Sequence, residues 1–226
     1  MTTLYFARHG ETEWHAEHRY AGSSDVALVP DAMLQAAGLA AWAGTAELSA
    51  IVASPLSRAR LTAEPAAEAA GLPLRIDQRL VEIDFGRGEG MSPAELAAAF
   101  PEDWAGFGRQ PAQHPLPDGE SGRAGIARAM PVLDELAAEF PDGSVLVVGH
   151  ATLMRLMLCE LVGLDPDWYR DIFPALDNSA LLELEFPYVG ESSWPGRARI
   201  LGINVPPISH VPRAELQPVD QAATSE

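Results

Sequence analysis

Strand-like and helix-like segments alternate along this chain from its first residues, and this alternation limits the possible folds more than any other feature. Strands are predicted by short apolar, partly β-branched stretches at 3–7, 48–53, 72–76, 144–149, 180–186 and 197–205. Helices are predicted between them, at 31–43, 55–70, 121–140 and 151–162. This order predicts an α/β domain, a three-layer α/β/α sandwich whose central sheet is mainly parallel.

Prolines set several of the expected boundaries. Pro55 predicts the first helical position of the segment 55–70, and Pro65 predicts a kink or a break within it. Ser92 before Pro93 predicts a short capped helix.

The middle and the end of the chain are less regular. Residues 101–120 contain four prolines and three glycines, which predicts a long loop inserted as a cap over the functional site. We expect a single domain over 1–206, followed by a polar, proline-containing tail over 207–226.

The charge balance excludes several classes of function. The chain has 15 Arg, no Lys, and 32 Asp and Glu, so its formal net charge is −17. Nucleic acids and anionic membranes bind basic surfaces, so neither is an expected partner. The single Cys159 excludes an intrachain disulfide and a Cys-rich zinc site. The chain shows no signal-peptide pattern and no membrane-length apolar run, so we expect a cytoplasmic protein.

Polar side chains follow three of the predicted strands, at the point where each strand ends. Arg8 and His9 follow the first strand. Arg58 lies shortly after the second, and His150 follows the strand at 144–149. The carboxyl ends of parallel strands meet at one edge of a sheet, where ligands bind. Because Arg forks match phosphate oxygens and keep their charge, these side chains predict a site for a small dianion such as a phosphomonoester.

Six motifs occur in a recognisable order. They are LYFARHGETEW, SPLSRARLTA, LVEIDFGRGEG, PDGES, VVGHATLMR and the turn at Asp177, Asn178 and Ser179. Together they resemble the signature of the histidine phosphatase superfamily, in its phosphoglycerate mutase-like branch. The resemblance covers roughly residues 3–186 and implies that family's sandwich fold and a phosphatase of its type.

The resemblance implies a catalytic role for four of the matching residues. His9 would attack phosphorus through one ring nitrogen and become phosphohistidine, while the backbone carbonyl just after it holds the other nitrogen. Arg8, Arg58 and His150 would hold the phosphoryl oxygens and offset charge in the transition state. These side chains do the charge work that Mg²⁺ does elsewhere, so no metal or other cofactor is expected.

The resemblance also implies an acid and further contacts. Glu82 would protonate the leaving oxygen and then take a proton from water, and Asp84 and Glu89 are the nearby alternatives. Additional phosphate or substrate contacts are expected from Thr12, His15, Gly22, Ala151 and Thr152.

Two positions depart from the family pattern. His15 stands where the family usually has an Asn that touches the transferring phosphoryl group, and Ala21 stands where a polar residue is usual. Both departures bear on the substrate, because the nucleophile and the acid are retained. His15 and His18 form an H-x-x-H pair, but the sequence offers no evident third ligand for a metal.

The substrate is less constrained than the chemistry. Within the predicted cap, Trp104, Phe107, Arg109 and His114 could contact the leaving group, and Arg109 would suit the carboxylate of a sugar-acid phosphate. We therefore expect a phosphomonoesterase acting on a small phosphorylated metabolite, a sugar phosphate or a sugar-acid phosphate. A homodimer is compatible with the sequence.

Two other functions stay open. One is phosphoryl transfer of the phosphoglycerate mutase type, although family mutases carry a longer and more basic insertion between the Glu and second His motifs. Here those residues, Glu82 and His150, are 68 positions apart, and the interval holds four Arg. The other is a non-catalytic phosphate-binding protein, against which the complete set of catalytic residues argues.

Overall fold

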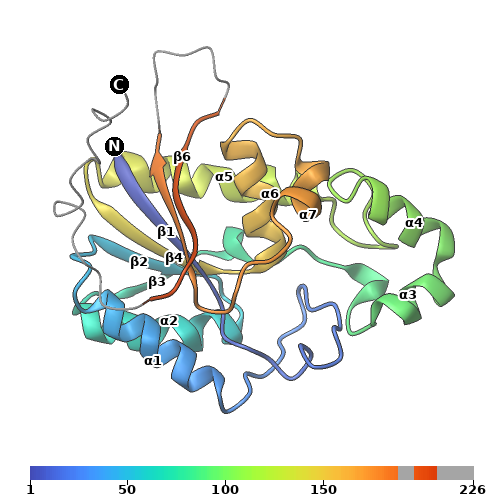
Figure 1. Ribbon diagram of the computed structural model, residues 1–226, viewed down its shortest axis with the longest axis horizontal. Helices are drawn as coiled ribbons and strands as arrows, with labels where there is room; N and C mark the ends of the chain where they lie inside the picture. Colours follow the sequence, from blue (N-terminus) through green and yellow to red (C-terminus); the bar gives the residue numbers. More distant parts are fainter. Residues whose placement is uncertain (188–195, 208–226) are drawn as a thin grey trace, which may run out of the picture.

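The computed structural model describes residues 1–187 and 196–207, and in these a six-stranded mixed sheet lies between two layers of helices (Figure 1). The strands are β1 (Thr2–Arg8), β2 (Ala50–Ala53), β3 (Leu74–Ile76), β4 (Ser144–Gly149), β5 (Leu181–Phe186) and β6 (Arg199–Val205). Their order across the sheet is β3-β2-β4-β1-β5-β6. The first four of these run parallel, whereas β5 is antiparallel to both of its neighbours. The predicted α/β sandwich is confirmed.

The helices divide between the two faces and one end of the sheet. They are α1 (Ala32–Ala43), α2 (Ser57–Ala70), α3 (Pro93–Ala99), α4 (Pro101–Arg109), α5 (Gly122–Glu139), α6 (Ala151–Leu161) and α7 (Tyr169–Ile172). Helices α1 and α2 cover one face, and α5 and α6 cover the other (Figure 1). Helices α3 and α4 extend to one side, away from the sheet.

Alternation along the central strands builds two hydrophobic cores. In β1, Leu4 and Phe6 belong to the core beneath α5 and α6, whereas Tyr5 and Ala7 face α1 and α2. The Tyr5 ring packs edge-on against Trp42 of α1, with ring centroids 4.9 Å apart. Because both faces of the sheet are covered, the central strands are continuous apolar runs, which is why the sequence marks them clearly.

In α2, the predicted start at Pro55 is wrong, and so is a break at Pro65. The helix begins at Ser57 instead of Pro55, because Leu56 is still extended and the Ser54 side chain is engaged elsewhere, 2.7 Å from His150. The helix also continues through Pro65 to Ala70 without a break. The cap at Ser92 is confirmed as a capping box, in which the Ser92 N–H donates to the Glu95 carboxylate at 2.8 Å.

The segment 101–120 is not the single long loop that was predicted. Its first half is α4, in which Pro101 occupies the first turn and Glu102 and Asp103 lie beside the positive end of the helix dipole. Proline therefore starts a helix here, and turns occupy 110–120.

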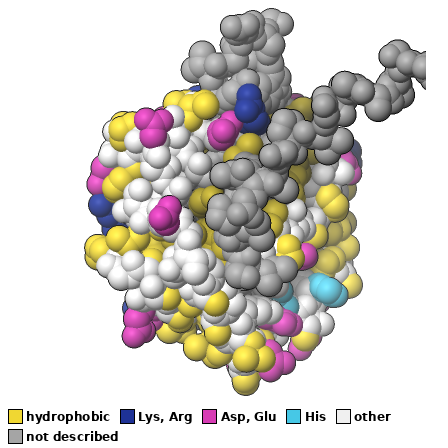
Figure 2. Space-filling model, turned by 60° about the vertical axis from the view of Figure 1, so that its left-hand side comes forward, with side chains coloured by type: hydrophobic (Ala, Val, Ile, Leu, Met, Phe, Trp, Pro, Cys, Tyr) yellow, Lys and Arg dark blue, Asp and Glu magenta, His cyan; other side chains and the backbone are white. Residues whose placement is uncertain are grey.

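Other expectations concern the surface and the end of the chain. On the face drawn in Figure 2, acidic side chains are scattered over the described surface and no basic patch gathers. Of the tail at 207–226, residues 208–226 lie outside the described part of the chain. None of the described helices combines the length and the apolar character needed to cross a bilayer.

Candidate active site

The sheet brings three loops to one edge. After β1, the His9 N–H donates to the Gly149 carbonyl at 2.9 Å, and after β2 the Ser54 N–H donates to the Val148 carbonyl at 3.0 Å. The ring centroids of His9 and His150 are consequently 5.2 Å apart. This is the convergence that the three strand ends predicted.

His9 is held in the state that a nucleophile needs. Its Nδ1 lies 2.7 Å from the Gly10 carbonyl, which accepts only, so Nδ1 carries the proton and Nε2 keeps a free lone pair. Burial, together with the charges of Arg58 and Arg8, holds the His9 pKa well below its ordinary value. The ring, only 4% exposed, is therefore neutral at pH 7.

Arg58 and Arg8 provide fixed positive charge beside His9. Arg58 is fully buried and donates to the carbonyls of Ser24 and Gly22, each at 2.7 Å. Arg8 donates to the Leu176 carbonyl at 2.9 Å. Burial lowers the pKa of both guanidiniums, that of Arg8 to about 10, so both stay charged at neutral pH. The Nε atom of each is buried and has no hydrogen-bond partner within the described residues.

His150 completes the ring of groups around His9. The Ser54 hydroxyl accepts the Leu56 N–H and lies 2.7 Å from His150 Nε2, and a bond donated by that hydroxyl to Nε2 would leave the ring proton on Nδ1. That Nδ1 is buried without a partner among the described residues. Burial, followed by Arg58 and His9, lowers the His150 pKa well below its ordinary value. The imidazoles are thus neutral, and the positive charge predicted for this site comes from the Arg side chains.

Three buried donors around His9 have no acceptor among the described residues. They are Nε of Arg8, Nε of Arg58 and Nδ1 of His150. Buried donors in native proteins are nearly always satisfied, and unsatisfied ones cost about 1–3 kcal/mol each. The oxygens of a phosphoryl group on His9 are acceptors of the kind that these three donors lack.

Glu82 is the carboxylate that reaches the cavity. Its Oε1 accepts the N–H groups of Ile83 at 2.9 Å and Leu153 at 2.8 Å, and its Oε2 accepts that of Thr152 at 2.9 Å. The last two donors belong to the first turn of α6, so the end of that helix fixes the carboxylate. Oε2 accepts one hydrogen bond from the described residues, which leaves it able to contact a substrate oxygen.

The two alternative acids are engaged elsewhere. Asp84 accepts the Gly86 N–H at 2.8 Å and closes a turn. Glu89 accepts backbone N–H groups from Gly22, Ser23, Ser24 and Phe85. Neither carboxylate lines the cavity, so the geometry favours Glu82.

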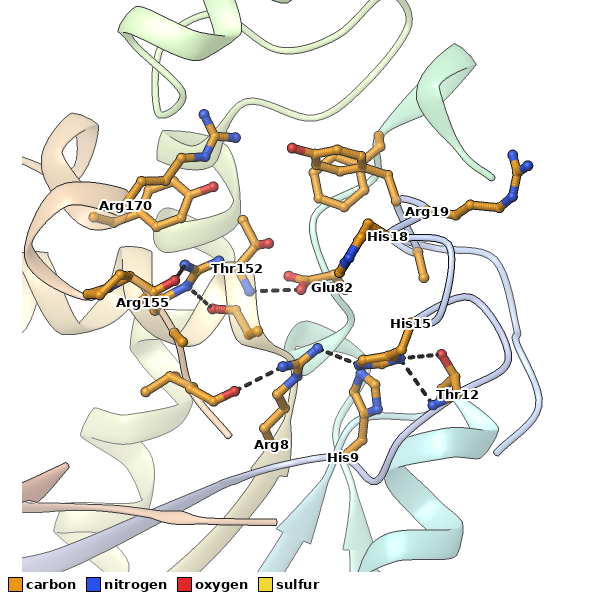
Figure 3. A pocket seen from close by; sticks show the side chains of 18 of the residues that line it. Arg8, His9, Thr12, His15, His18, Arg19, Glu82, Thr152, Arg155 and Arg170 are labelled. Carbon is orange, nitrogen blue, oxygen red and sulfur yellow. Dashed lines mark hydrogen bonds between the residues drawn. The ribbon is translucent and has the colours of Figure 1, made fainter. Parts of the chain in front are cut away.

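A cavity of about 360 Å³ opens above His9 (Figure 3). It is lined by the candidates Arg8, His9, Thr12, His15, Glu82, Ala151 and Thr152. Arg58 and His150 are fully buried and do not themselves line this cavity.

Gly22 contacts Arg58 and does not contact the cavity. Its carbonyl accepts from Arg58, and a Cβ there would come within 2.2 Å of the Glu89 carboxylate and of the Ile83 carbonyl. Only glycine fits such a close approach, and the residue positions Arg58 without lining the cavity.

Sequence reasoning placed Arg109 in the site, and the structure does not. Arg109 is exposed near the end of α4, and none of the residues 101–120 lines the cavity. The cap contacts a residue of the cavity wall instead, because the Phe107 carbonyl accepts a hydrogen bond from Arg170 at 3.0 Å. The Arg170 guanidinium also lies over the Phe107 ring, 4.3 Å from the ring centroid.

The structure adds cavity residues that the sequence analysis missed. They include Tyr20, Arg155, Tyr169 and Arg170. Arg155 could have been found from the sequence, because it lies four positions after Ala151 and therefore on the same face of α6. No sequence pattern placed Arg170 there, because its position at the cavity depends on packing against Phe107.

His15 lies where the family usually has Asn, and it binds Arg8. Its Nε2 is 2.5 Å from Nη2 of Arg8, and its Nδ1 accepts the Thr12 N–H at 3.1 Å and lies 2.8 Å from the Thr12 hydroxyl. Burial, then the charge of Arg8, lowers the His15 pKa to about 4. Among the described residues, no cluster of three or more His, Cys, Asp or Glu side chains could hold a metal ion.

Comparison with known proteins agrees with this geometry. The model of the histidine phosphatase superfamily (branch 1) matches residues 4–192. The chain belongs to this superfamily. Phosphoserine phosphatase 1 of Hydrogenobacter thermophilus is 35% identical over 165 residues, covering 73% of this chain and 78% of that protein. A probable phosphoglycerate mutase of Salmonella arizonae is 34% identical over 199 residues, covering 86% and 88%.

Solved structures of histidine phosphatase relatives share the fold. The mycobacterial glucosyl-3-phosphoglycerate phosphatase in complex with VO3 superposes with a TM-score of 0.79 at 27% identity, covering 90% of this chain and 99% of that one. The predicted family and fold class are confirmed, and this histidine phosphatase is a phosphoric monoester hydrolase.

Replacing His15 with Asn is expected to make the fold less sensitive to acid. The folded pKa of His15 is depressed, so unfolded protein takes up a proton below pH ~6.5 that folded protein refuses, and stability is lost as the pH falls from there toward about 4. Partial solvent exposure of the ring reduces the effect to about 1 kcal/mol between pH ~7.5 and ~5.5. Urea unfolding of both proteins at the two pH values measures it, and an equal acid loss in both would contradict the assignment.

Proposed function

We propose that the protein hydrolyses a small phosphorylated metabolite, a sugar phosphate or sugar-acid phosphate, through a phosphohistidine on His9 and without a metal. The observation that carries this proposal is the state of His9: a neutral, buried ring whose Nδ1 proton is held 2.7 Å from the Gly10 carbonyl. Its Nε2 lone pair therefore lies beside the fixed charges of Arg8 and Arg58. A nucleophile of this kind matches an attack on phosphorus.

The first step transfers the phosphoryl group to the enzyme. His9 Nε2 forms a bond to phosphorus as the bond from phosphorus to the leaving oxygen breaks. Protonated Glu82 delivers its proton to that oxygen, and the alcohol departs. The donors on Arg8, Arg58 and His150 offset the charge of the phosphoryl oxygens in the transition state.

The second step returns the enzyme to its starting form. A water molecule attacks phosphorus, Glu82 takes a proton from it, and the bond from phosphorus to His9 breaks. Phosphate leaves, and Glu82 is again protonated for the next ester. The same carboxylate thus serves as acid and then as base, which its place at the cavity wall allows.

The cavity suits a small ester. Its volume of about 360 Å³ lies at the lower end of the range of small-molecule sites. The rings of Tyr20, Phe85 and Tyr169 line it and offer flat apolar surface to a sugar or a similar leaving group. Such metabolites are cytoplasmic, and we place the enzyme there.

The position of the Arg residues between Glu82 and His150 favours hydrolysis over mutase activity. A mutase must bind the alcohol product while phosphohistidine is protected from water. The four Arg between the Glu and second His motifs are Arg87, Arg109, Arg123 and Arg128, and none of them lines the cavity. A mutase of this family with a basic insertion would be expected to place cations there.

Phosphate release in EDTA tests the function. We expect the purified protein to release phosphate from a panel of sugar phosphates, sugar-acid phosphates, phosphoglycerates and nucleotides with the chelator present. Release that is unaffected by EDTA and ranked by leaving group supports the proposal and identifies the substrate class. A folded protein that releases no phosphate from any ester, but interconverts 2- and 3-phosphoglycerate, would show a mutase instead.

A further inference from the structure

Two cavity-lining cations remain without a role in the phosphoryl chemistry. In this acidic chain, most of the described Arg side chains form ion pairs with carboxylates: Arg19, Arg60, Arg75, Arg79, Arg123, Arg128, Arg197 and Arg199. Arg155 and Arg170 have no carboxylate partner among the described residues, although both line the cavity. Figure 3 shows them on the wall formed by α6 and α7, across the cavity from Thr12.

Arg155 is held so that one nitrogen stays available. Its Nε donates to the Ala151 carbonyl at 3.0 Å, and its Nη1 donates to the carbonyls of Phe173 at 3.2 Å and Pro174 at 3.0 Å. These bonds fix the guanidinium and leave Nη2 without a partner in the described chain. The side chain is rigid before any ligand arrives, which lowers the entropic cost of binding.

Arg170 is held in a similar way by aromatic rings. Its Nη1 donates to the Phe107 carbonyl, and its guanidinium stacks on the Phe107 and Tyr169 rings, 4.3 and 5.1 Å from their centroids. Its Nη2 is buried and has no partner that meets the geometry of a hydrogen bond among the described residues, although the Tyr20 hydroxyl interacts with this guanidinium. An unpaired buried charged donor is costly, and such donors mark places where an acceptor belongs.

Both cations pack against the same aromatic ring, that of Tyr169. The Arg155 guanidinium is 4.7 Å from the centroid of the Tyr169 ring that Arg170 also stacks on. Burial lowers the pKa of Arg155, and the charge of Arg170 acts in the same direction, whereas Tyr169 and Glu82 oppose it. Glu82 is the acidic side chain among the described residues that line the cavity, and it is fixed by backbone N–H groups. An anionic group of a ligand in the cavity, which both side chains line, would offset the charge of the two guanidiniums.

We propose that Arg155 and Arg170 form a second anion subsite, which binds a carboxylate on the leaving group and so selects phosphomonoesters of carboxylic acids. The proposal rests on the proposed function and extends it to specificity. Arg8 and Arg58 already match the two charges of the phosphoryl group. A carboxylate has two oxygens for two guanidiniums and adds one charge, whereas a second phosphoryl group would add about two charges to a site that already holds one phosphoryl group.

A pair of matched substrates tests the subsite without changing the protein. 3-Phosphoglycerate and glycerol 3-phosphate differ by a carboxylate in place of a hydroxymethyl group. Wild-type kcat/KM is expected to be about 10- to 100-fold higher for 3-phosphoglycerate. This factor corresponds to the free energy of one hydrogen bond to a charged group. A ratio near one would overturn the proposal even if both esters were hydrolysed.

Substitution of Arg170 locates the effect. Arg170→Gln is expected to lower the acid-to-neutral ratio of kcat/KM about 10- to 100-fold, mainly through a higher KM for the acid, with a much smaller change for glycerol 3-phosphate. Arg155→Gln should act in the same direction, but it also loses carbonyl contacts, so a thermal melt accompanies it. Arg109→Gln is the matched control, because Arg109 is exposed and does not line the cavity. Equal loss on both esters in Arg170→Gln would overturn the subsite.

Failure of the proposed function can be told apart from failure of the subsite. If no ester is hydrolysed, the proposed function fails, and calorimetric binding of 3-phosphoglycerate and glycerol 3-phosphate still tests the subsite. Tighter binding of the acid that Arg170→Gln removes would support it. Equal binding of the two esters, or binding of neither, would overturn it.

Discussion

His9→Ala is expected to abolish phosphate release, lowering kcat by about 10³-fold or more for every ester that the wild-type protein hydrolyses. In the proposed mechanism the neutral Nε2 of His9 forms the covalent bond, and no other described side chain at the cavity combines a free lone pair with burial among Arg8 and Arg58. His15 also lines the cavity, but its Nε2 is occupied by Arg8. It cannot replace His9 without giving up that contact.

Trapping the intermediate makes the prediction specific. Wild-type protein mixed with substrate and quenched should carry one phosphoryl group that is labile in acid and stable in alkali, and His9→Ala should carry none. The matched control is His114→Ala, which removes an exposed imidazole that contacts Gln110 away from the cavity. Phosphorylation of His9→Ala at full rate would refute the role of His9. A melt guards against misfolding, since loss of the buried ring should lower stability by about 1–3 kcal/mol.

The positions of the catalytic side chains could be inferred from the sequence because they depend on strand ends. A buried parallel strand is a continuous apolar run, and the polar residue that ends it is easily seen. His9, Ser54 and His150 follow three such runs, and the register of β1, β4 and β2 brings them together. The motif resemblance then separated Glu82 from Asp84 and Glu89, which spacing alone could not do.

Charge and specificity could not be inferred in the same way. The sequence shows four basic-looking groups at the site, but burial keeps His9 and His150 neutral, and burial is a property of the folded packing. Arg109 looked suited to the substrate because it lies in an irregular segment, yet α4 points it to solvent. Arg170 reaches the cavity through Phe107, a contact across 63 positions that no local pattern encodes.

Glu82→Gln is expected to slow hydrolysis of alkyl phosphates by about 10²–10⁴-fold in kcat/KM, and to slow p-nitrophenyl phosphate much less. An alkoxide is a poor leaving group and needs the proton that Glu82 delivers, whereas p-nitrophenolate leaves without one. The amide keeps an oxygen to accept from Ile83 and Leu153, so the loop should stay in place. Its NH₂ group faces the Thr152 N–H and loses that one bond.

The second half-reaction gives an independent signature of the same residue. With p-nitrophenyl phosphate, the Glu82→Gln variant should transfer the phosphoryl group quickly and then hydrolyse phosphohistidine slowly, because no base activates water. A burst of p-nitrophenol equal to the enzyme concentration, seen by stopped flow, is the expected result. Asp84→Asn is the matched control, since Asp84 closes a turn off the cavity and its amide oxygen can still accept the Gly86 N–H. Equal losses on alkyl and nitrophenyl esters, with no burst, would mean that another group carries the proton.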